Sequence, residues 1–148
     1  MAGLAAIALI RDAGGRILLV RQRGGPFAGA WLLPGGRAGD DESAVHALAR
    51  EVREETGLTL EDAAYLTGYR TSAAGTELSV LLYRATARGT PAAEPGSAVC
   101  WSLPDAVPDA HPVLRRELYD ALGIGDPDAI ARDLAAAGIT LEPLDPPA

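Results

Sequence analysis

The spacing of apolar and polar positions predicts strands at the start of the chain. Residues 4–11 and 16–23 are apolar, β-prone runs, and Asp12-Ala13-Gly14-Gly15 lies between them. The two glycines can adopt positive φ at a turn, so this pattern predicts a β-hairpin. A glycine-rich stretch over residues 24–29 and an apolar run over residues 31–33 follow, and Pro34-Gly35-Gly36 opens a loop.

A helical period replaces the strand pattern over residues 42–56. Asp40 or Asp41 is the expected N-cap, because a short acidic side chain accepts hydrogen bonds from the first turn of a helix. Gly57 is expected to end the helix, since glycine readily adopts the left-handed conformation of a C′ residue. The apolar stripe expected to face the core consists of Val45, Leu48, Ala49 and Val52.

Strands and helices share the remainder of the chain. Strands are expected over residues 58–70, 76–88 and 98–102, with a turn near residues 72–75 and a Pro- and Gly-containing loop over residues 89–96. Helices are expected over residues 111–122 and 127–137, and an extended, mobile tail over residues 143–148. Strands with helices between and after them predict an α+β or α/β sandwich.

Length and cysteine content restrict the class of protein. The 148 residues suit one domain, and the single cysteine, Cys100, excludes an intramolecular disulfide. The apolar segment at residues 4–10 is too short to span a bilayer, and no basic residue precedes it as in a signal peptide. We therefore expect a cytoplasmic protein without membrane association.

The charge balance favours a small phosphorylated substrate over a nucleic-acid polymer. The net charge is −7, whereas nucleic-acid binders need a cationic surface. All 13 basic residues are arginines, so direct phosphate contacts must come from guanidinium groups, backbone amides or a metal ion. A divalent cation would let an acidic protein hold a phosphate ester.

Three glutamates on the predicted helix are candidate metal ligands. Glu51, Glu54 and Glu55 stand at positions i, i+3 and i+4, which places them on one face. Clustered carboxylates suit a hard cation such as Mg²⁺ or Mn²⁺. The helix alone leaves a second interpretation open, a solvated charged face in which Arg50 and Glu54 form an ordinary ion pair.

The residues around this helix resemble the Nudix box, which spans Gly36 to Leu58 here. Gly36 is followed after five residues by Glu42, and after seven more by Arg50-Glu51-Val52-Arg53-Glu54-Glu55-Thr56-Gly57-Leu58. Every fixed position of the box is occupied, and Leu33-Pro34-Gly35 precedes it in the usual way. The resemblance covers about residues 4–122 and implies the Nudix fold, a mixed β-sheet flanked by helices. It implies one Nudix domain over residues 1–148, with a C-terminal extension over residues 123–148.

The resemblance implies a metal-dependent hydrolase that cuts a diphosphate linkage. Glu51, Glu54 and Glu55 would bind the metal, joined by the carbonyl of Gly35, and Glu42 and Arg50 would orient these groups. The glycines, including Gly36, would let the loop approach the metal closely. Either Glu54 or a residue of a later loop would act on the attacking water. For that later loop, Glu94 is the candidate and Glu77 its competitor.

Basic and aromatic residues near the box are candidate substrate contacts. Arg21 and Arg23 lie two positions apart on one strand, which places both on one face, with solvated edge arginines as the alternative. Arg37 and Arg70 are weaker candidates. Phe27, Trp31 and Tyr69 could stack on a base, although Trp31 has a structural role as its alternative. His46 is expected to face away from the glutamates.

Sequence motifs outside the box leave the substrate open. No coenzyme A, NADH or ADP-ribose signature is present, and by elimination the chain resembles the small MutT-like group that acts on nucleoside triphosphates. A nucleotide sugar or a dinucleoside polyphosphate is the alternative substrate. A Nudix fold that only binds nucleotides is a further alternative, but such proteins usually lack the box glutamates. Homodimers are frequent in the family, and the sequence does not decide the oligomeric state or the role of the extension.

Overall fold

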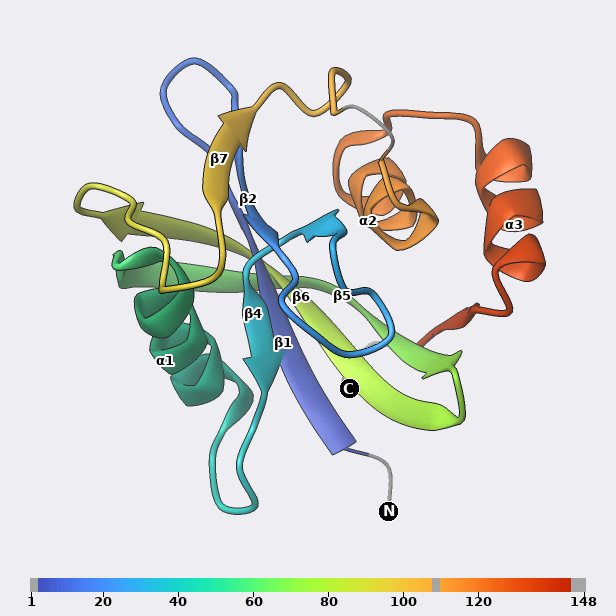
Figure 1. Cartoon of the computed structure of the whole chain (residues 1–148), viewed down its shortest axis with the longest axis horizontal. Coiled ribbons are helices and arrows are strands. Elements are labelled where there is room, and N and C mark those ends of the chain that lie inside the picture. The colour runs from blue at the N-terminus through green and yellow to red at the C-terminus, as the bar shows by residue number, and fades with distance from the viewer. Residues whose placement is uncertain (1–2, 108–109, 145–148) are drawn as a thin grey trace.

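The computed structural model describes residues 3–107 and 110–144, which form two sheets and three helices (Figure 1). The five-stranded sheet has the order β4-β1-β6-β5-β8, and the three-stranded sheet has the order β3-β2-β7. The strands are β1 Gly3–Ile10, β2 Ile17–Arg21, β3 Trp31–Leu32, β4 Gly35–Arg37, β5 Thr59–Ala73, β6 Thr76–Arg88, β7 Val99–Ser102 and β8 Thr140–Pro143. The helices are α1 Ala44–Thr56, α2 Pro112–Leu122 and α3 Pro127–Ala136.

Strand β1 is central in its sheet, and the predicted hairpin with β2 is wrong. β1 pairs in parallel with β6 and antiparallel with β4, whereas β2 pairs with β3 and β7 in the other sheet. Only one bridge, Arg11 to Ile17, joins the two runs beside the Asp12 turn. The physical reason is burial on both faces of β1, because such a strand needs neighbours on both edges and cover on both faces.

Helices cover the two faces of the sheet, as the predicted sandwich requires. Ala6, Ala8 and Ile10 of β1 pack in one core with Leu48 and Val52 of α1. Leu9, between them in sequence, packs in a second core with Leu114 and Leu118 of α2. Because successive side chains of a strand point to opposite faces, α1 and α2 lie on opposite sides of the sheet (Figure 1). The mixed sheet flanked by helices confirms the predicted fold class.

The start of α1 differs from the sequence-based expectation. The N-cap is Ser43, whose side chain accepts a hydrogen bond from the backbone N–H of His46, rather than Asp40 or Asp41. The first expected helical residue, Glu42, instead directs its carboxylate to the preceding loop, so the helix begins after it. Gly57 ends the helix with φ of 76°, as predicted.

The buried face of α1 is also rotated from the expected stripe. Ala47, Leu48, Val52 and Thr56 are buried, whereas Val45 is 45% exposed. Ala47 rather than Val45 therefore faces the core, because a helix that begins at Ala44 packs on the sheet mainly through its later turns.

The C-terminal segment adds a strand that the sequence-based interpretation missed. β8 pairs antiparallel with β5, with Thr71 opposite Leu141. No element was expected over residues 138–142, and Pro143 was expected to begin the extended tail. Residues 145–148 of that tail lie outside the described residues. Helix α3 packs on the remaining buried cluster through Ile130 and Leu134. Within the described ranges, no helix is long and apolar enough to cross a membrane.

Candidate active site

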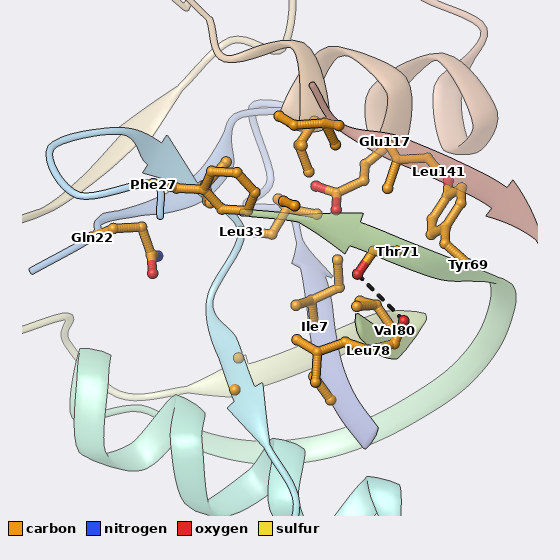
Figure 2. Close-up of a pocket in the computed structure, with 17 residues that line it drawn as sticks. Ile7, Gln22, Phe27, Leu33, Tyr69, Thr71, Leu78, Val80, Glu117 and Leu141 are labelled. Atoms are coloured by element: carbon orange, nitrogen blue, oxygen red, sulfur yellow. Dashed lines mark hydrogen bonds between the residues drawn. The ribbon is translucent and has the colours of Figure 1, made fainter. Parts of the chain in front are cut away.

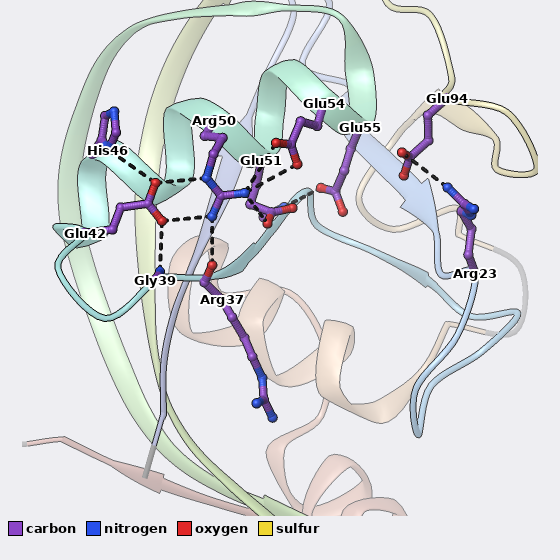
Figure 3. Close-up of polar contacts among 11 residues, drawn as sticks. Arg23, Arg37, Gly39, Glu42, His46, Arg50, Glu51, Glu54, Glu55 and Glu94 are labelled. Atoms are coloured by element: carbon purple, nitrogen blue, oxygen red, sulfur yellow. Dashed lines mark hydrogen bonds and ion pairs between the residues drawn. The ribbon is translucent and has the colours of Figure 1, made fainter. Parts of the chain in front are cut away.

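A bidentate ion pair ties the loop after β4 to α1. Arg50 donates from Nε to Oε2 of Glu42 at 2.9 Å and from Nη2 to Oε1 at 2.8 Å. The same Nη2 donates to the carbonyl of Arg37, and the N–H of Gly39 donates to Glu42 (Figure 3). These bonds, with that from Arg50 first, lower the pKa of Glu42 to about 2 and raise the pKa of Arg50. Glu42 therefore remains ionised near neutral pH.

Glu51, Glu54 and Glu55 project from one face of α1, beside Arg50 and β4 (Figure 3). Arg50 Nη1 donates to Glu51 at 2.9 Å and reaches Glu54 at 3.4 Å. The N–H of Gly35 donates to Oε1 of Glu55 at 2.8 Å. Burial raises the pKa of Glu55 to about 8, and the like charges of Glu51, Glu94 and Glu54 add to this effect. Burial also raises the pKa of Glu51.

The two glycines of β4 are needed for close approach. A Cβ on Gly36 would lie 2.5 Å from the Cδ atom of Glu51. Gly35 has φ of 149°, and a Cβ there would meet the carbonyl oxygen of Ala6 at 2.1 Å. A side chain at either position would therefore displace the sheet or the carboxylates.

A polar hollow lies beside the glutamates and collects the predicted basic and acidic residues of two loops. Its lining includes Arg21, Gln22, Arg23, Glu55, Glu94 and Ser97. Arg23 Nη1 lies 3.3 Å from Oε2 of Glu94, so the two candidates from separate segments meet here (Figure 3). The hollow thus combines guanidinium groups with carboxylates, which is the chemistry that a metal-bound phosphate group requires.

Other sequence candidates lie away from this hollow. The side chain of Arg37 points away from the glutamates, and only its carbonyl joins the network (Figure 3). Glu77 sits next to the β5–β6 turn, and Arg70 lies opposite Glu142 of β8. His46 Nδ1 lies 3.2 Å from Oε2 of Glu42, on the far side of that pair from the three glutamates (Figure 3).

The structure also contains an apolar cavity, which the sequence did not indicate (Figure 2). Its lining includes Ile7, Phe27, Leu33, Val80, Leu141 and the carboxyl of Glu117. The cavity has a volume of about 180 Å³. Gln22 lines both the cavity and the hollow. Of the predicted aromatic candidates, Phe27 and Tyr69 line the cavity, whereas Trp31 packs against the core beside α2.

Comparisons with known proteins agree with the box and the fold. The NUDIX domain family matches residues 1–122. The chain belongs to the Nudix family. Over 123 residues it is 34% identical to a MutT-like protein from Streptomyces ambofaciens, covering 80% of the chain and 76% of that protein. The crystal structure of a MutT NUDIX hydrolase from Burkholderia pseudomallei superposes with a TM-score of 0.74 at 32% identity, covering 82% of this chain and 98% of that one.

A shorter match concerns a differently named relative. Over 43 residues the chain is 44% identical to an ADP-ribose pyrophosphatase from Methanocaldococcus jannaschii, covering 29% of this chain. The chain spans about a quarter of the length of that curated relative, 25%. This match therefore supports similarity over those 43 residues only.

The side chains of this Nudix site suit a divalent cation by their chemistry. Among the described residues, no three His, Cys, Asp or Glu side chains converge as they stand on one ion position. Nevertheless, Glu51 and Glu55 are partly buried carboxylates whose pKa values are raised first by burial and then by the like charges of neighbouring glutamates. A hard cation among these oxygens would offset that repulsion and prefers such ligands. The donor set fits Mg²⁺ or Mn²⁺.

Proposed function

We propose that this Nudix protein hydrolyses nucleoside triphosphates to nucleoside monophosphates and pyrophosphate, with Mg²⁺ or Mn²⁺ as cofactor. The observation that carries the proposal is the junction of two unlike spaces at Gln22. One is the polar hollow beside the box glutamates, and the other is the apolar cavity. A nucleotide has a charged polyphosphate and a flat ring, so it can occupy both spaces at once. Inorganic polyphosphate would leave the apolar cavity unused.

The proposed roles follow the box. Glu51, Glu54, Glu55 and the carbonyl of Gly35 would hold the metal. When bound, the metal supplies neutralisation of phosphate charge and a lower pKa for coordinated water. Arg50 keeps the carboxylates and the loop in place through its bonds to Glu42, Glu51 and the carbonyl of Arg37. Residues 1–148 act together as one domain in this proposal, since β8 completes the sheet that carries the site.

The remaining side chains act on the substrate and on water. Arg21 and Arg23 in the hollow contact the phosphate oxygens, while Glu54 or Glu94 accepts the proton of the attacking water. Water forms a new bond to phosphorus, and the bond from that phosphorus to the bridging oxygen breaks, so the electron pair leaves with pyrophosphate. Glu94 is favoured over Glu77 because it lines the hollow and pairs with Arg23.

The relatives' names are consistent with this class of reaction. One relative is named MutT-like, and another is named for cleaving ADP-ribose at its pyrophosphate linkage. An assay must therefore include three alternatives to a triphosphate: ADP-ribose, a nucleotide sugar and a dinucleoside polyphosphate.

The test is release of phosphate or pyrophosphate from a substrate panel with and without Mg²⁺. The panel contains the nucleoside triphosphates, ADP-ribose, a nucleotide sugar and a dinucleoside polyphosphate. We expect Mg²⁺-dependent pyrophosphate release, with the highest kcat/KM for a triphosphate. A higher kcat/KM for ADP-ribose or a nucleotide sugar than for any triphosphate would show that the preferred substrate is that compound. Tight binding of panel members without turnover of any of them would overturn the proposal of an enzyme and indicate a nucleotide-binding protein.

A further inference from the structure

One charged residue interrupts the buried face of α2. The buried residues of this helix are Val113, Leu114, Leu118 and Glu117. Glu117 is only 5% exposed. Its carboxyl group points into the apolar cavity (Figure 2). A carboxyl group in such surroundings loses hydration, which an apolar side chain of similar size would not.

The carboxyl of Glu117 has unused hydrogen-bonding capacity. Among the residues drawn around the cavity, none forms a hydrogen bond with it (Figure 2). Two other polar groups of the wall are already engaged: the Thr71 hydroxyl donates to the carbonyl of Leu78, and the Tyr69 hydroxyl donates to Asp120 at 2.6 Å. Gln22 stands apart from them, where the cavity meets the hollow. Burial raises the pKa of Glu117 to about 8, with the charge of Asp120 as a second cause. The wall therefore offers Glu117 as a polar group that can bind a ligand.

We propose that Glu117 is the residue that selects the ring of the substrate, and that it favours guanine. This inference rests on the proposed nucleotide hydrolase function. The two oxygens of a carboxyl lie side by side and match two neighbouring polar positions on a ring edge. An ionised carboxylate accepts from the two adjacent N–H groups of guanine, one at the ring nitrogen N1 and one at the 2-amino group.

A ring without two adjacent N–H groups satisfies the ionised carboxylate less well. Hypoxanthine has a C–H where guanine carries its 2-amino group, and the Watson–Crick edges of adenine, cytosine, uracil and thymine each offer N–H donors at only one position, so only one good bond to the carboxylate forms. The apolar walls supply contact area without choosing between rings, and Phe27 and Val80 belong to them. Discrimination between rings is therefore assigned to Glu117.

Part of the cavity wall comes from the C-terminal extension. Ile139 and Leu141 line the cavity and lie beyond residue 122, where the match to the NUDIX domain family ends. Leu141 is held in place because β8 pairs with β5 beside Tyr69 and Thr71. The extension thus shapes the space into which Glu117 points.

Matched pairs of nucleotides test this assignment without hydrolysis. Binding of GMP against IMP, and of CMP against UMP, is measured by calorimetry on the wild-type protein without metal, at a pH above 8, where the Glu117 carboxyl ionises. A monophosphate contains no diphosphate bond, so it is not hydrolysed. We expect GMP to bind about tenfold more tightly than IMP, and CMP and UMP to bind alike. Glu117→Met keeps a similar length and should remove that preference, while Glu61→Met on exposed β5 is the matched control.

Glu117→Gln adds a second arm. An amide donates and accepts but cannot accept twice, so this variant should lose the preference for GMP over IMP. Melting temperatures of all variants check that they fold. Equal binding of GMP and IMP by the wild-type protein, or a preference for GMP that survives in Glu117→Met, would overturn the assignment. Failure of triphosphate hydrolysis with the binding preference intact would overturn only the proposed reaction.

Discussion

Arg50 donates a hydrogen bond to each carboxylate oxygen of Glu42, with N–O distances of 2.8 and 2.9 Å, and so holds the loop between β4 and α1 against the helix. Nη1 of the same guanidinium reaches Glu51 at 2.9 Å. One planar group therefore fixes the loop and a proposed metal ligand together. A lysine ammonium cannot reproduce this fork, because its donors radiate from a single nitrogen.

Replacement of Arg50 by lysine should lower activity because the loop and Glu51 lose their common support. We expect Arg50→Lys to reduce kcat/KM by about 10–100-fold, the usual cost of removing a group that orients metal ligands. Steady-state assays at saturating Mg²⁺ measure it. Arg88→Lys is the matched control, since Arg88 makes only an exposed contact of 3.9 Å with Glu61. Wild-type activity in Arg50→Lys would show that the fork has no role in the reaction.

Glu54→Gln should nearly abolish turnover with little change in stability without metal. The side chain of Glu54 is 53% exposed and has a weak 3.4 Å contact to Arg50, so the fold depends little on its charge. Loss of a proposed metal ligand or base should reduce kcat by about 10²-fold or more. Turnover and the melting temperature without metal are compared with those of Glu61→Gln. Equal turnover in wild type and Glu54→Gln would place the reaction elsewhere.

Gly36→Ala should damage the site through one methyl group. The new Cβ would lie 2.5 Å from the Cδ atom of Glu51, so the carboxylate or the strand must move. Misplacement by about 1 Å can cost roughly 10²-fold in rate, and we expect a loss of that order in kcat/KM. Gly14→Ala is the control, because its Cβ would meet nothing closer than 3.5 Å. An active Gly36→Ala enzyme would contradict close approach as the reason for glycine.

Arg23→Ala should raise KM for triphosphates more than it changes the melting temperature. Arg23 is half-exposed and contacts Glu94 at 3.3 Å, so its contribution to the fold is small. Loss of a charge-assisted bond to phosphate should raise KM about tenfold or more. Arg16→Ala, which removes an ion pair with Asp12 in a remote turn, is the control. An unchanged KM would indicate that Arg23 is a solvated arginine at the strand edge and does not contact the substrate.

Glu117 should make the stability of the unliganded protein fall as pH rises. Its pKa is about 8 in the folded protein against an ordinary value of 4.5, so the folded state holds the proton more tightly than the unfolded chain. The contribution is complete below pH 4.5 and is lost as pH approaches 8, by up to about 1.4 kcal/mol per pH unit. Glu117→Gln removes this contribution and leaves that of Glu55, whose pKa is also about 8. Urea unfolding at pH 5 and pH 8 measures it, with Glu61→Gln as control, and parallel pH curves for wild type and Glu117→Gln would contradict the prediction.

The sequence was a good guide wherever the structure depends on local spacing. The box places Glu51, Glu54 and Glu55 on one face because a helix repeats every 3.6 residues, and Gly57 ends that helix because of its φ. The strands β5 and β6 were expected close to their observed bounds, since a two-residue turn at Ala74-Gly75 joins them. Whether these residues have their proposed roles remains a prediction.

Features that need distant segments could not be read in the same way. The apolar run of β1 suits a hairpin or a central strand equally well, and its true neighbours, β4 and β6, are decided by packing on both faces. The apolar cavity combines residues of β1, β5, β6, α2 and the C-terminal extension, and no spacing along the chain links Gln22 with Glu117. The one local signal was Glu117 itself, an acidic residue within the apolar stripe of α2.

The parallel pairing of β1 with β6 has a consequence for biosynthesis. Ala5 is paired with Val80, so β1 finds this neighbour only after β2 to β5 and α1 have been synthesised. Until then its apolar side chains lack their cover, and such exposed strands are prone to associate with other chains. The site helix α1 is synthesised within this interval, so a nascent chain carries its box glutamates before the sheet beneath them exists.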